Sequence, residues 1–411
     1  MKILIFGGHY EPDLGPSAPI FTMLCENLVR LGHQVTMIAG VPHFPSGRVP
    51  AKWRGKLLWH SVENGVEVIR VGLPSVDRMK LPWRLLQYLT YQIGTTLAGL
   101  RREYDVVLSG SSSLTSWLPF AVLAVWRRKP SIYAVYDVYP GVGIKLGIFR
   151  HKPVIWLITQ METFCLHRST LVRIISESFR SELLEMGVPD EKMVMIYDWV
   201  DTELVRPLPQ DNPFAQENDL VGKFVVLYAG NLGLSQGLEH VLAAAEMLAD
   251  HQDLLFVFVG DGANRERLVS SAHQRQLKNV RFLPFQPRDR LPEVAASASV
   301  SLVTLQRGIA NHSIPSKTFT ILASGRPIIA SIDEDSDAWR LIQKAQAGLC
   351  VPPEDPAALA AAILQLREAE EFRKTLGENA RKWAEDNHSP LSGAMKIEKM
   401  LFEAIKISSR P

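Results

Sequence analysis

The segment LYAGNLGLSQGLEHVL, Leu227–Leu242, decides the fold class, because it leads from an apolar run through a glycine-rich turn directly into a helical pattern. The run Phe224–Tyr228 predicts a buried strand, and Gly237–Ala249, with apolar residues at helical spacing, predicts a helix. The same order of strand, glycine turn and helix occurs in IFGGHYEPDLGPSAP, Ile5–Pro19, and in FVFVGDGANRERL, Phe256–Leu268. Strands separated by helices indicate parallel sheets with right-handed crossovers.

Short apolar runs alternate with amphipathic stretches along the rest of the chain. Residues 207–218, rich in Pro, Asp and Asn, look like a linker. We therefore predict an α/β protein with two Rossmann-like, doubly wound domains, residues 1–206 and 207–385, followed by a helical segment, 386–411. Ligands of such sheets bind at the carboxyl ends of the strands, here in a cleft between the domains. The further predicted strands are Lys2–Phe6, Gln34–Ala39, Val66–Arg70, Val106–Ser109, Ile132–Tyr136, Leu171–Ile175, Leu254–Val259, Val280–Leu283, Val300–Val303 and Ile328–Ala330.

The composition is that of an ordinary globular protein, with 411 residues, 46% hydrophobic and 21% charged, and a formal net charge of +2. This charge balance does not indicate a nucleic-acid partner. Cys25, Cys165 and Cys350 lie far apart without a CxxC spacing, so neither a disulfide framework nor a zinc site is predicted. A reducing compartment, the cytoplasm, is the simpler interpretation. No stretch reaches the roughly 18 apolar residues of a membrane span.

Glycine turns after strands are the first candidate ligand contacts. Gly15, Gly230, Gly260 and Gly262 follow predicted strands, and Asn231 adjoins one of them. A residue without a Cβ lets the backbone approach a ligand closely. Because glycine is also a common way to leave a strand, the signal lies in several such turns on one sheet edge.

These turns, together with IPSKTFTILASGRPIIAS, Ile314–Ser331, and GLCVPPEDPAALAAAI, Gly348–Ile363, resemble the retaining GT-B glycosyltransferases of family four. The similarity covers nearly the whole chain and is closest to the bacterial enzymes of O-antigen, capsule and exopolysaccharide assembly. It implies a first domain that binds a glycan or polyprenyl-linked saccharide acceptor and a second that binds a nucleotide-sugar donor, expected to be UDP-linked. It also implies a final helix that crosses back to the first domain, and neither a metal ion nor another cofactor.

The chain departs from this family at its charged donor contacts. Relatives carry two Glu residues in an E-x7-E arrangement where this chain has His312 and Thr320. They also carry Arg and Lys where this chain has Asn231 and Gln236. A bound nucleoside diphosphate would therefore lack the cations that relatives supply.

Lys317 is the candidate for the missing positive charge. It lies in the first turn of a predicted helix, after Ile314, Pro315 and Ser316, where the helix dipole already disfavours a cation. A bound phosphate explains this placement, with Ser316 and the free N–H groups of the helix start as further donors. The alternative is an exposed Lys that only solubilises the helix.

Two further positions complete the predicted donor site. Thr320 offers one hydroxyl to the ribose where relatives have a carboxylate, which is a weaker hydrogen bond. The resemblance places the base beside LPFQP, Leu283–Pro287, so Phe285 is the candidate for the base contact. Core packing is the alternative for Phe285.

Asp137 is the candidate catalytic residue on the acceptor side, together with Lys317 on the donor side. Asp137 follows the predicted strand in IYAVYDVYPGVG, and relatives carry a polar residue near this point. It can accept a proton from the acceptor hydroxyl or position the donor sugar, and a helix cap or turn is the alternative. Other candidates on this side are His9, Glu11, Asp13 and His43. The resemblance implies that the leaving diphosphate helps to deprotonate the acceptor, so no protein nucleophile is assigned.

The segment VDRMKLPWRLLQYLTYQIGTTLAGLRR, 76–102, predicts an amphipathic helix with basic ends. Such a helix can lie on an anionic membrane, here the inner face of the cell membrane. The alternative is that its apolar stripe packs on the sheet. The stripe is Trp83, Leu86, Leu89, Ile93 and Leu97, and the basic residues are Arg78, Lys80, Arg84, Arg101 and Arg102.

Two other classes share the predicted architecture. A nucleotide-sugar epimerase of GT-B fold would work without an acceptor and would need catalytic carboxylates and His residues. A non-catalytic nucleotide-sugar-binding subunit would explain the missing Glu pair.

Overall fold

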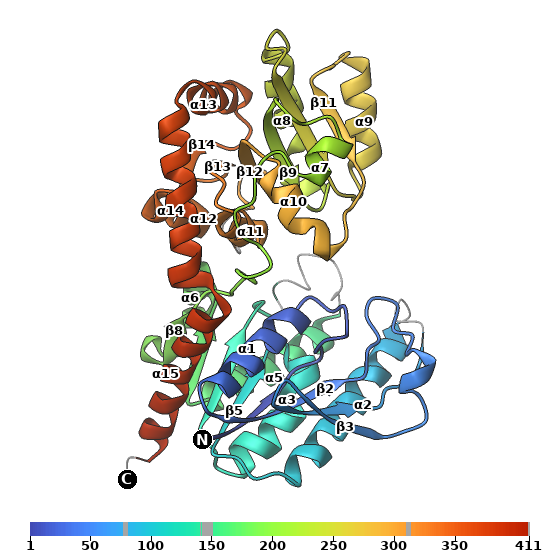
Figure 1. The fold of residues 1–411 in the computed structure, drawn as a ribbon. Coiled ribbons are helices and arrows are strands. Elements are labelled where there is room, and N and C mark those ends of the chain that lie inside the picture. The colour runs from blue at the N-terminus through green and yellow to red at the C-terminus, as the bar shows by residue number, and fades with distance from the viewer. Residues whose placement is uncertain (77–80, 140, 142–150, 310–313, 410–411) are drawn as a thin grey trace. The chain divides into compact units, whose positions relative to one another are not determined.

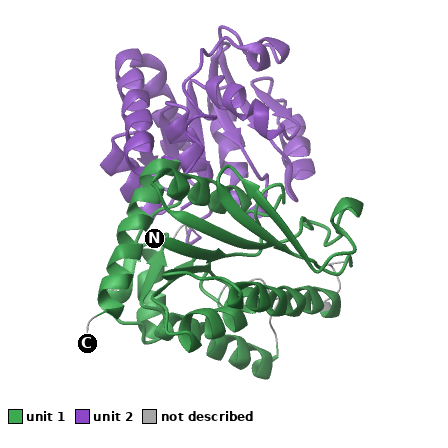
Figure 2. Cartoon of the chain, turned by 60° about the horizontal axis from the view of Figure 1, so that its bottom comes forward, with its two compact units in different colours: residues 1–198, 390–411 green, residues 199–389 purple. Residues whose placement is uncertain are grey.

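The computed structural model describes residues 1–76, 81–139, 141, 151–309 and 314–409. The chain forms two compact units (Figure 2): unit 1 contains residues 1–198 and 390–411, and unit 2 contains residues 199–389. Each unit has its own sheet, and helices connect the parallel strands (Figure 1). The predicted α/β class with two doubly wound domains is confirmed.

Unit 1 is built on an eight-stranded sheet with the order β3-β4-β2-β1-β5-β6-β7-β8. Neighbouring strands are parallel except for β3 and β4, which form an antiparallel pair at one edge. The strand order changes direction between β1 and β5, the place where doubly wound sheets bind ligands. The strands are β1 (Lys2–Phe6), β2 (Gln34–Gly40), β3 (Leu58–Glu63), β4 (Val66–Val71), β5 (Val106–Gly110), β6 (Ser131–Val135), β7 (Leu171–Ile174) and β8 (Met193–Met195).

The helices of unit 1 form two groups. Right-handed crossovers place α1 on one face of the sheet and α2, α3 and α5 on the other, because the strand order runs in opposite directions from β1. α15 packs against α1, while α3 contacts both α2 and α5. The helices are α1 (Ala18–Arg30), α2 (Leu81–Leu100), α3 (Ser113–Phe120) with a π turn η2 (Ala121–Trp126), α5 (Lys152–Arg168), α6 (Ser178–Glu185) and α15 (Pro390–Ser408), with short turns η1 (Ala51–Trp53) and η3 (Asp190–Lys192).

Unit 2 is built on a six-stranded, all-parallel sheet with the order β11-β10-β9-β12-β13-β14. Its switch point lies between β9 and β12. The strands are β9 (Phe224–Ala229), β10 (Leu254–Val259), β11 (Val280–Leu283), β12 (Val300–Thr304), β13 (Ile328–Ser331) and β14 (Gly348–Val351). The helices are α7 (Pro213–Glu217), η4 (Leu234–Gln236), α8 (Leu238–Met247), α9 (Arg265–Gln274), η5 (Arg288–Arg290), α10 (Leu291–Ala296), α11 (Lys317–Ala323), α12 (Asp337–Ala345), α13 (Pro356–Glu368) and α14 (Glu370–His388).

Two local differences from the sequence interpretation have physical reasons. The predicted linker, residues 207–218, is wrong in part because it contains α7, whose first turn is capped by the Asn212 side chain accepting from Ala215 N. Phe214 of this helix is buried in the core of unit 2. Strand β3 was not predicted, because an edge strand keeps exposed apolar residues such as Val62 and lacks a buried run.

Helix α15 belongs to unit 1 although it follows unit 2 in sequence. It contacts α1, β5 and β6. Its inward side chains include Ile397, Met400 and Leu401, all of which are buried. His33, at the end of the loop after α1, also bonds to Glu398 of α15, with 2.7 Å between Nε2 and Oε1. The last helix of the chain thus packs on the sheet and on α1 of unit 1.

Candidate functional site

A cavity of about 460 Å³ opens in unit 2 at the carboxyl end of β9, beside the start of α11. It collects seven of the residues that the sequence predicted for donor binding, namely Gly230, Asn231, Phe285, Pro315, Ser316, Lys317 and Thr320. Apolar residues of β9, β10, α10 and α11 also line it. These lining residues are Leu227, Val259, Leu291, Val294, Ala295 and Ile321.

Lys317 is the only charged side chain among the described residues that line this cavity. Its Nζ is buried and has no hydrogen-bond partner within the described part of the chain. The ammonium lies over the Tyr228 ring, 3.5 Å from the ring centroid, so its one attractive neighbour is an aromatic face. Burial lowers the pKa of Lys317 to about 7. The exposed, solubilising Lys of the alternative interpretation does not fit this environment.

The glycine turns of unit 2 pack against each other. Gly230 and Gly260 have φ of 140° and 144°, which other residues rarely adopt. A Cβ on Gly260 would lie 2.0 Å from the Gly230 carbonyl oxygen. Of the predicted glycines in this unit, Gly230 lines the cavity, whereas Gly260 and Gly262 do not. The close approach that these two glycines permit is between turns of the backbone.

Ile314, another predicted donor contact, is buried and also lies outside the lining of the cavity.

The remaining donor candidates have distinct environments. Phe285 is 75% exposed and lines the cavity, so core packing does not explain it. Thr320 lines the same wall as Lys317. Gln236 places a buried Oε1 without a partner at the cavity. His312 lies outside the described residues. Sequence reasoning missed Tyr228, whose only signal is its position two residues before the glycine turn.

A second cavity, of about 190 Å³, lies in unit 1 at the carboxyl ends of β1, β5 and β6. Asp137 lines it, and partial burial raises the pKa of that carboxyl. His9 and His43 line it as well, whereas Glu11 does not. Hydroxyl and aromatic groups supply most of the rest: Ser17, Phe21, Tyr88, Tyr91, Ser111, Ser112, Thr115, Ser116, Tyr136 and Tyr139.

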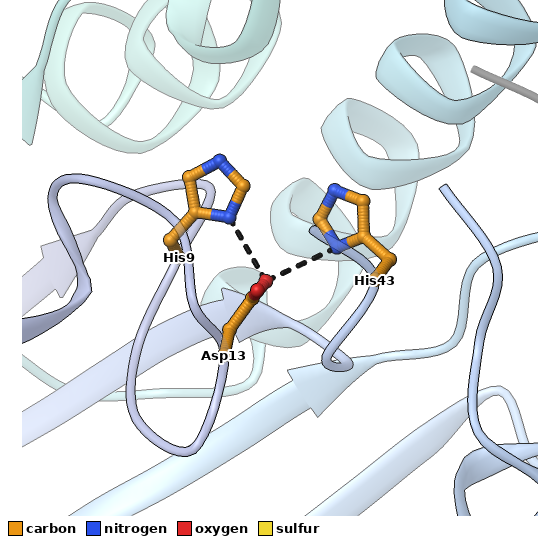
Figure 3. Close-up of side chains that lie close together, drawn as sticks. All are labelled: His9, Asp13 and His43. Carbon is orange, nitrogen blue, oxygen red and sulfur yellow. Dashed lines mark hydrogen bonds and ion pairs between the residues drawn. The ribbon is translucent and has the colours of Figure 1, made fainter. Parts of the chain in front are cut away.

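His9, Asp13 and His43 form a cluster at this second cavity (Figure 3). Asp13 Oδ2 accepts from His9 Nδ1 at 2.9 Å and lies 3.3 Å from His43 Nδ1. Burial alone would raise the pKa of Asp13, but the hydrogen bonds from His43 and His9 outweigh it and hold the pKa well below its usual range. Gly15, predicted as a donor contact, instead lies against the imidazole of His9, because a Cβ there would be 2.2 Å from His9 Cγ.

Two family models match the chain. A model described as glycosyl transferases group 1 matches residues 210–383, and one described as a glycosyl transferase 4-like domain matches residues 17–199. The chain is a two-domain glycosyltransferase. The enzyme class predicted from the sequence is confirmed.

Named relatives agree with this identification. The glycosyltransferase is 29% identical over 378 residues to the putative colanic acid biosynthesis glycosyl transferase WcaI of Escherichia coli K12, covering 89% of this chain and 92% of the relative. It is 27% identical over 330 residues to the probable glycosyltransferase WbjE of Pseudomonas aeruginosa, covering 77% and 82%.

Solved structures establish the GT-B fold. Sucrose-phosphate synthase from Thermosynechococcus elongatus superimposes with a TM-score of 0.72 at 18% identity, over 99% of both chains. The Anabaena protein HepE, in complex with UDP-glucose, superimposes with a TM-score of 0.67 at 17% identity, over 98% of this chain and 100% of that one.

Helix α2 gives the glycosyltransferase an unusual surface, because its polar residues face inward. Gln87 is 2% exposed, and its Nε2 donates to Gly47 O and Pro74 O, both at 2.8 Å. Gln92 bonds to Leu114 O and Leu118 N of α3. The apolar side chains face outward instead: Trp83, Leu85, Leu86, Leu89, Ile93, Leu97 and Leu100 are all exposed. The alternative interpretation, in which this stripe packs on the sheet, is therefore wrong.

Beside α2, η2 ends in Trp126, which is 72% exposed. Arg84 lies on the first turn of α2 and Arg101 directly after its end, whereas Arg78 and Lys80 lie outside the described residues. No helix among the described residues has the length and apolar character that crossing a membrane requires.

Proposed function

We propose that this glycosyltransferase moves a sugar from a nucleoside-diphosphate sugar, UDP-linked, to a glycan or polyprenyl-linked saccharide in the biosynthesis of a bacterial surface polysaccharide. The observation that carries the proposal is the Nζ of Lys317, buried without a partner in the cavity of unit 2. The name of the E. coli relative, for colanic acid, and the UDP-glucose complex of HepE support the polysaccharide and the UDP donor.

Lys317 is the proposed diphosphate contact. A buried cation with no carboxylate among the described lining residues is costly, and the lowered pKa expresses that cost. An anion bound beside Nζ would restore the charged state and form charge-assisted hydrogen bonds. The developing charge of the leaving diphosphate is then stabilised in a cavity whose other described lining residues are uncharged, which is the main catalytic effect we assign.

The other lining residues supply the rest of the donor site in this proposal. Phe285, an exposed ring at the cavity, stacks on the base, and the apolar wall of α10 excludes water from it. Thr320 offers its hydroxyl to the ribose. Gln236 Oε1, buried without a partner, accepts from a donor hydroxyl. The site takes the donor without a divalent metal because Lys317 supplies the positive charge.

We propose the retaining course that the family resemblance implies. The leaving diphosphate then helps to take up the proton of the acceptor hydroxyl, and no protein nucleophile is required. Asp137, at the cavity of unit 1, positions the acceptor. Proton NMR of the product tests this point, because an inverted anomeric configuration contradicts it.

The acceptor is proposed to lie on an anionic membrane surface, the cytoplasmic face of the cell membrane. The support is the outward apolar stripe of α2, from Trp83 to Leu100, with Arg84 and Arg101 at its two ends. An apolar helix face with flanking cations matches the boundary between acyl chains and anionic headgroups.

The deciding experiment is a thermal-shift screen of nucleotides and nucleotide sugars, followed by a transfer assay with the donor found. A ligand of the native state raises the melting temperature. Conversion of the nucleotide sugar in the absence of any acceptor would indicate an epimerase instead. Donor binding without turnover on any acceptor would indicate a non-catalytic subunit, an alternative favoured by the lack of carboxylates among the described lining residues of the donor cavity.

A further inference from the structure

Asp13 is a buried carboxylate whose hydrogen-bonding capacity is fully used. Its Oδ1 accepts from Gly15 N at 3.3 Å and from Phe44 N at 3.2 Å. Its Oδ2 accepts from His9 Nδ1 at 2.9 Å and lies 3.3 Å from His43 Nδ1. An ionised carboxylate that accepts from two backbone amides and from His9, with the His43 Nδ1–H shared between Asp13 and Val41 O, is a fixed support for both rings.

These hydrogen bonds determine which nitrogen of each imidazole carries the proton. His9 Nδ1 donates to Asp13, and His43 Nδ1 donates to Val41 O at 2.9 Å. In the neutral rings both Nε2 atoms are therefore hydrogen-bond acceptors. No described residue bonds to either Nε2. Figure 3 shows both Nε2 atoms on the side of the rings away from Asp13, and both rings line the cavity of unit 1.

The two rings are held as a pair. Their centroids are 5.1 Å apart with an interplanar angle of 21°, so the rings are stacked, and Figure 3 shows their Nε2 atoms on the same side. Gly15 leaves the room that His9 occupies, because a Cβ on Gly15 would lie 2.2 Å from His9 Cγ and 2.4 Å from Nδ1. The ring of Phe44 meets His9 edge-on, with centroids 5.6 Å apart.

We propose that His9 and His43 bind two neighbouring hydroxyls of one sugar ring, the acceptor saccharide, through their Nε2 atoms, and that Asp13 and Gly15 are positioning residues. Two acceptor nitrogens on imidazole rings stacked 5.1 Å apart suit two neighbouring hydroxyls of one sugar. The tyrosines that line the cavity offer the aromatic faces on which sugar rings pack. The inference rests on the proposed function for the role of acceptor, but the binding itself is independent of transfer.

Ligand-observed NMR of the full chain with methyl glycosides, without donor, tests the binding. The panel contains the methyl glycosides of glucose, galactose, mannose and fucose, each with its monodeoxy analogues. We expect at least one glycoside to bind and two of its deoxy analogues, at adjacent positions, to bind about three- to tenfold more weakly, the range of one neutral hydrogen bond. In His9→Ala the intact glycoside should weaken by a similar factor, and one of the two deoxy substitutions should have no further effect while the other, at the hydroxyl of His43, keeps its effect.

Gly15→Ala separates positioning from chemistry, because it displaces the His9 ring and removes no polar side-chain group. It should weaken the intact glycoside as His9→Ala does, and so should Asp13→Asn, since an amide N–H facing Nδ1 makes Nε2 a donor. His33→Ala is the matched control: it removes another histidine–carboxylate bond of unit 1, to Glu398, and should leave glycoside binding unchanged. Melting temperatures identify any variant that fails to fold.

Three results would overturn the inference. The first is that no glycoside of the panel binds the wild-type chain. The second is that both deoxy substitutions still cost their full factor in His9→Ala. The third is tight binding of Zn²⁺ that Asp13→Asn abolishes, because a metal ion on both Nδ1 atoms turns each Nε2 into a donor. Calorimetry with UDP separates these outcomes from failure of the proposed donor site, since UDP binding should be the same in all these variants.

Discussion

Replacing Lys317 by methionine removes one charge and keeps an unbranched side chain in the same cavity. The interaction lost with a nucleoside diphosphate is a charge-assisted hydrogen bond, about 1.5–3 kcal/mol. The dissociation constant of UDP should therefore rise by roughly one to two orders of magnitude. Uridine, which has no phosphate, should bind nearly as before.

The lowered pKa of Lys317 adds a second signature. With a pKa of about 7 in the empty cavity, roughly half of the side chains are protonated at pH 7 and about a tenth at pH 8. If the bound diphosphate restores the ordinary pKa, binding takes up about half a proton at pH 7 and about 0.9 at pH 8. The affinity for UDP should consequently fall as the pH rises through 7.

Titration calorimetry at pH 8 in buffers of different ionisation enthalpy measures this uptake directly. The Lys317→Met variant is the control, because it keeps the titration of the ligand itself and removes only that of the side chain. Equal proton uptake by both proteins, or equal weakening of uridine and UDP in the variant, would show that Lys317 shapes the cavity without holding phosphate.

The same substitution should stabilise the ligand-free chain. The native pKa of Lys317 is below its ordinary value of 10.5, so the unfolded state binds more protons between pH 7 and 10.5 and the free energy of unfolding rises with pH there. Below pH 7 the full cost of the buried charge applies, about 5 kcal/mol for a pKa that falls from 10.5 to about 7. Lys317→Met should thus gain about 4 kcal/mol at pH 7, seen as a higher melting temperature.

The remaining predictions concern other parts of the molecule. Phe285→Ala should weaken uridine and UDP equally, by about 1–3 kcal/mol, if the ring stacks on the base; unequal losses in calorimetry would contradict stacking. Burial raises the pKa of Glu162 to about 6, although hydrogen bonds from Ser113 and Tyr133 act in the opposite direction. The ionised carboxylate therefore lowers the free energy of unfolding by about 2 kcal/mol above pH 6 and has no such effect below pH 4, where it is protonated. Glu162→Gln should therefore raise the melting temperature at pH 7 but not at pH 4, and a rise at both would point to packing. Leu89→Glu should reduce flotation with anionic vesicles, whereas Met247→Glu on unit 2, an exposed control, should not; loss in neither would argue against the α2 surface. EDTA should leave UDP affinity unchanged in calorimetry, and a large loss would indicate a metal-dependent donor site.

The strands were predictable because buried parallel strands are short continuous apolar runs. β1, β10 and β11 have the bounds read from the sequence, Lys2–Phe6, Leu254–Val259 and Val280–Leu283. Edge strand β3 escaped prediction because one of its faces is exposed. Helix α2 was recognised from its period, but the period does not say which face is buried. The buried face is the one that carries Gln87 and Gln92, because their side-chain amides form hydrogen bonds with backbone groups of unit 1.

Donor candidates were predictable where a motif fixed them, as with Lys317 after Ile314–Pro315–Ser316. The glycine turns were predictable as turns but not as ligand contacts, since the same φ that admits a ligand also admits another backbone, as at Gly260. The cluster at Asp13 was visible only as separate candidates. His43 lies thirty residues away in sequence, and no periodicity brings it to Asp13; the adjacency of β1 and β2 does.

The return of α15 to unit 1 bears on how the chain is made and truncated. Residues 199–389 are continuous and can complete their core as soon as they leave the ribosome, while unit 1 must wait for Pro390–Ser408. Until then the surfaces of α1, β5 and β6 that α15 covers are exposed. A stop codon just before Pro390, distant in sequence from both cavities, would thus spare unit 2 and leave unit 1 aggregation-prone.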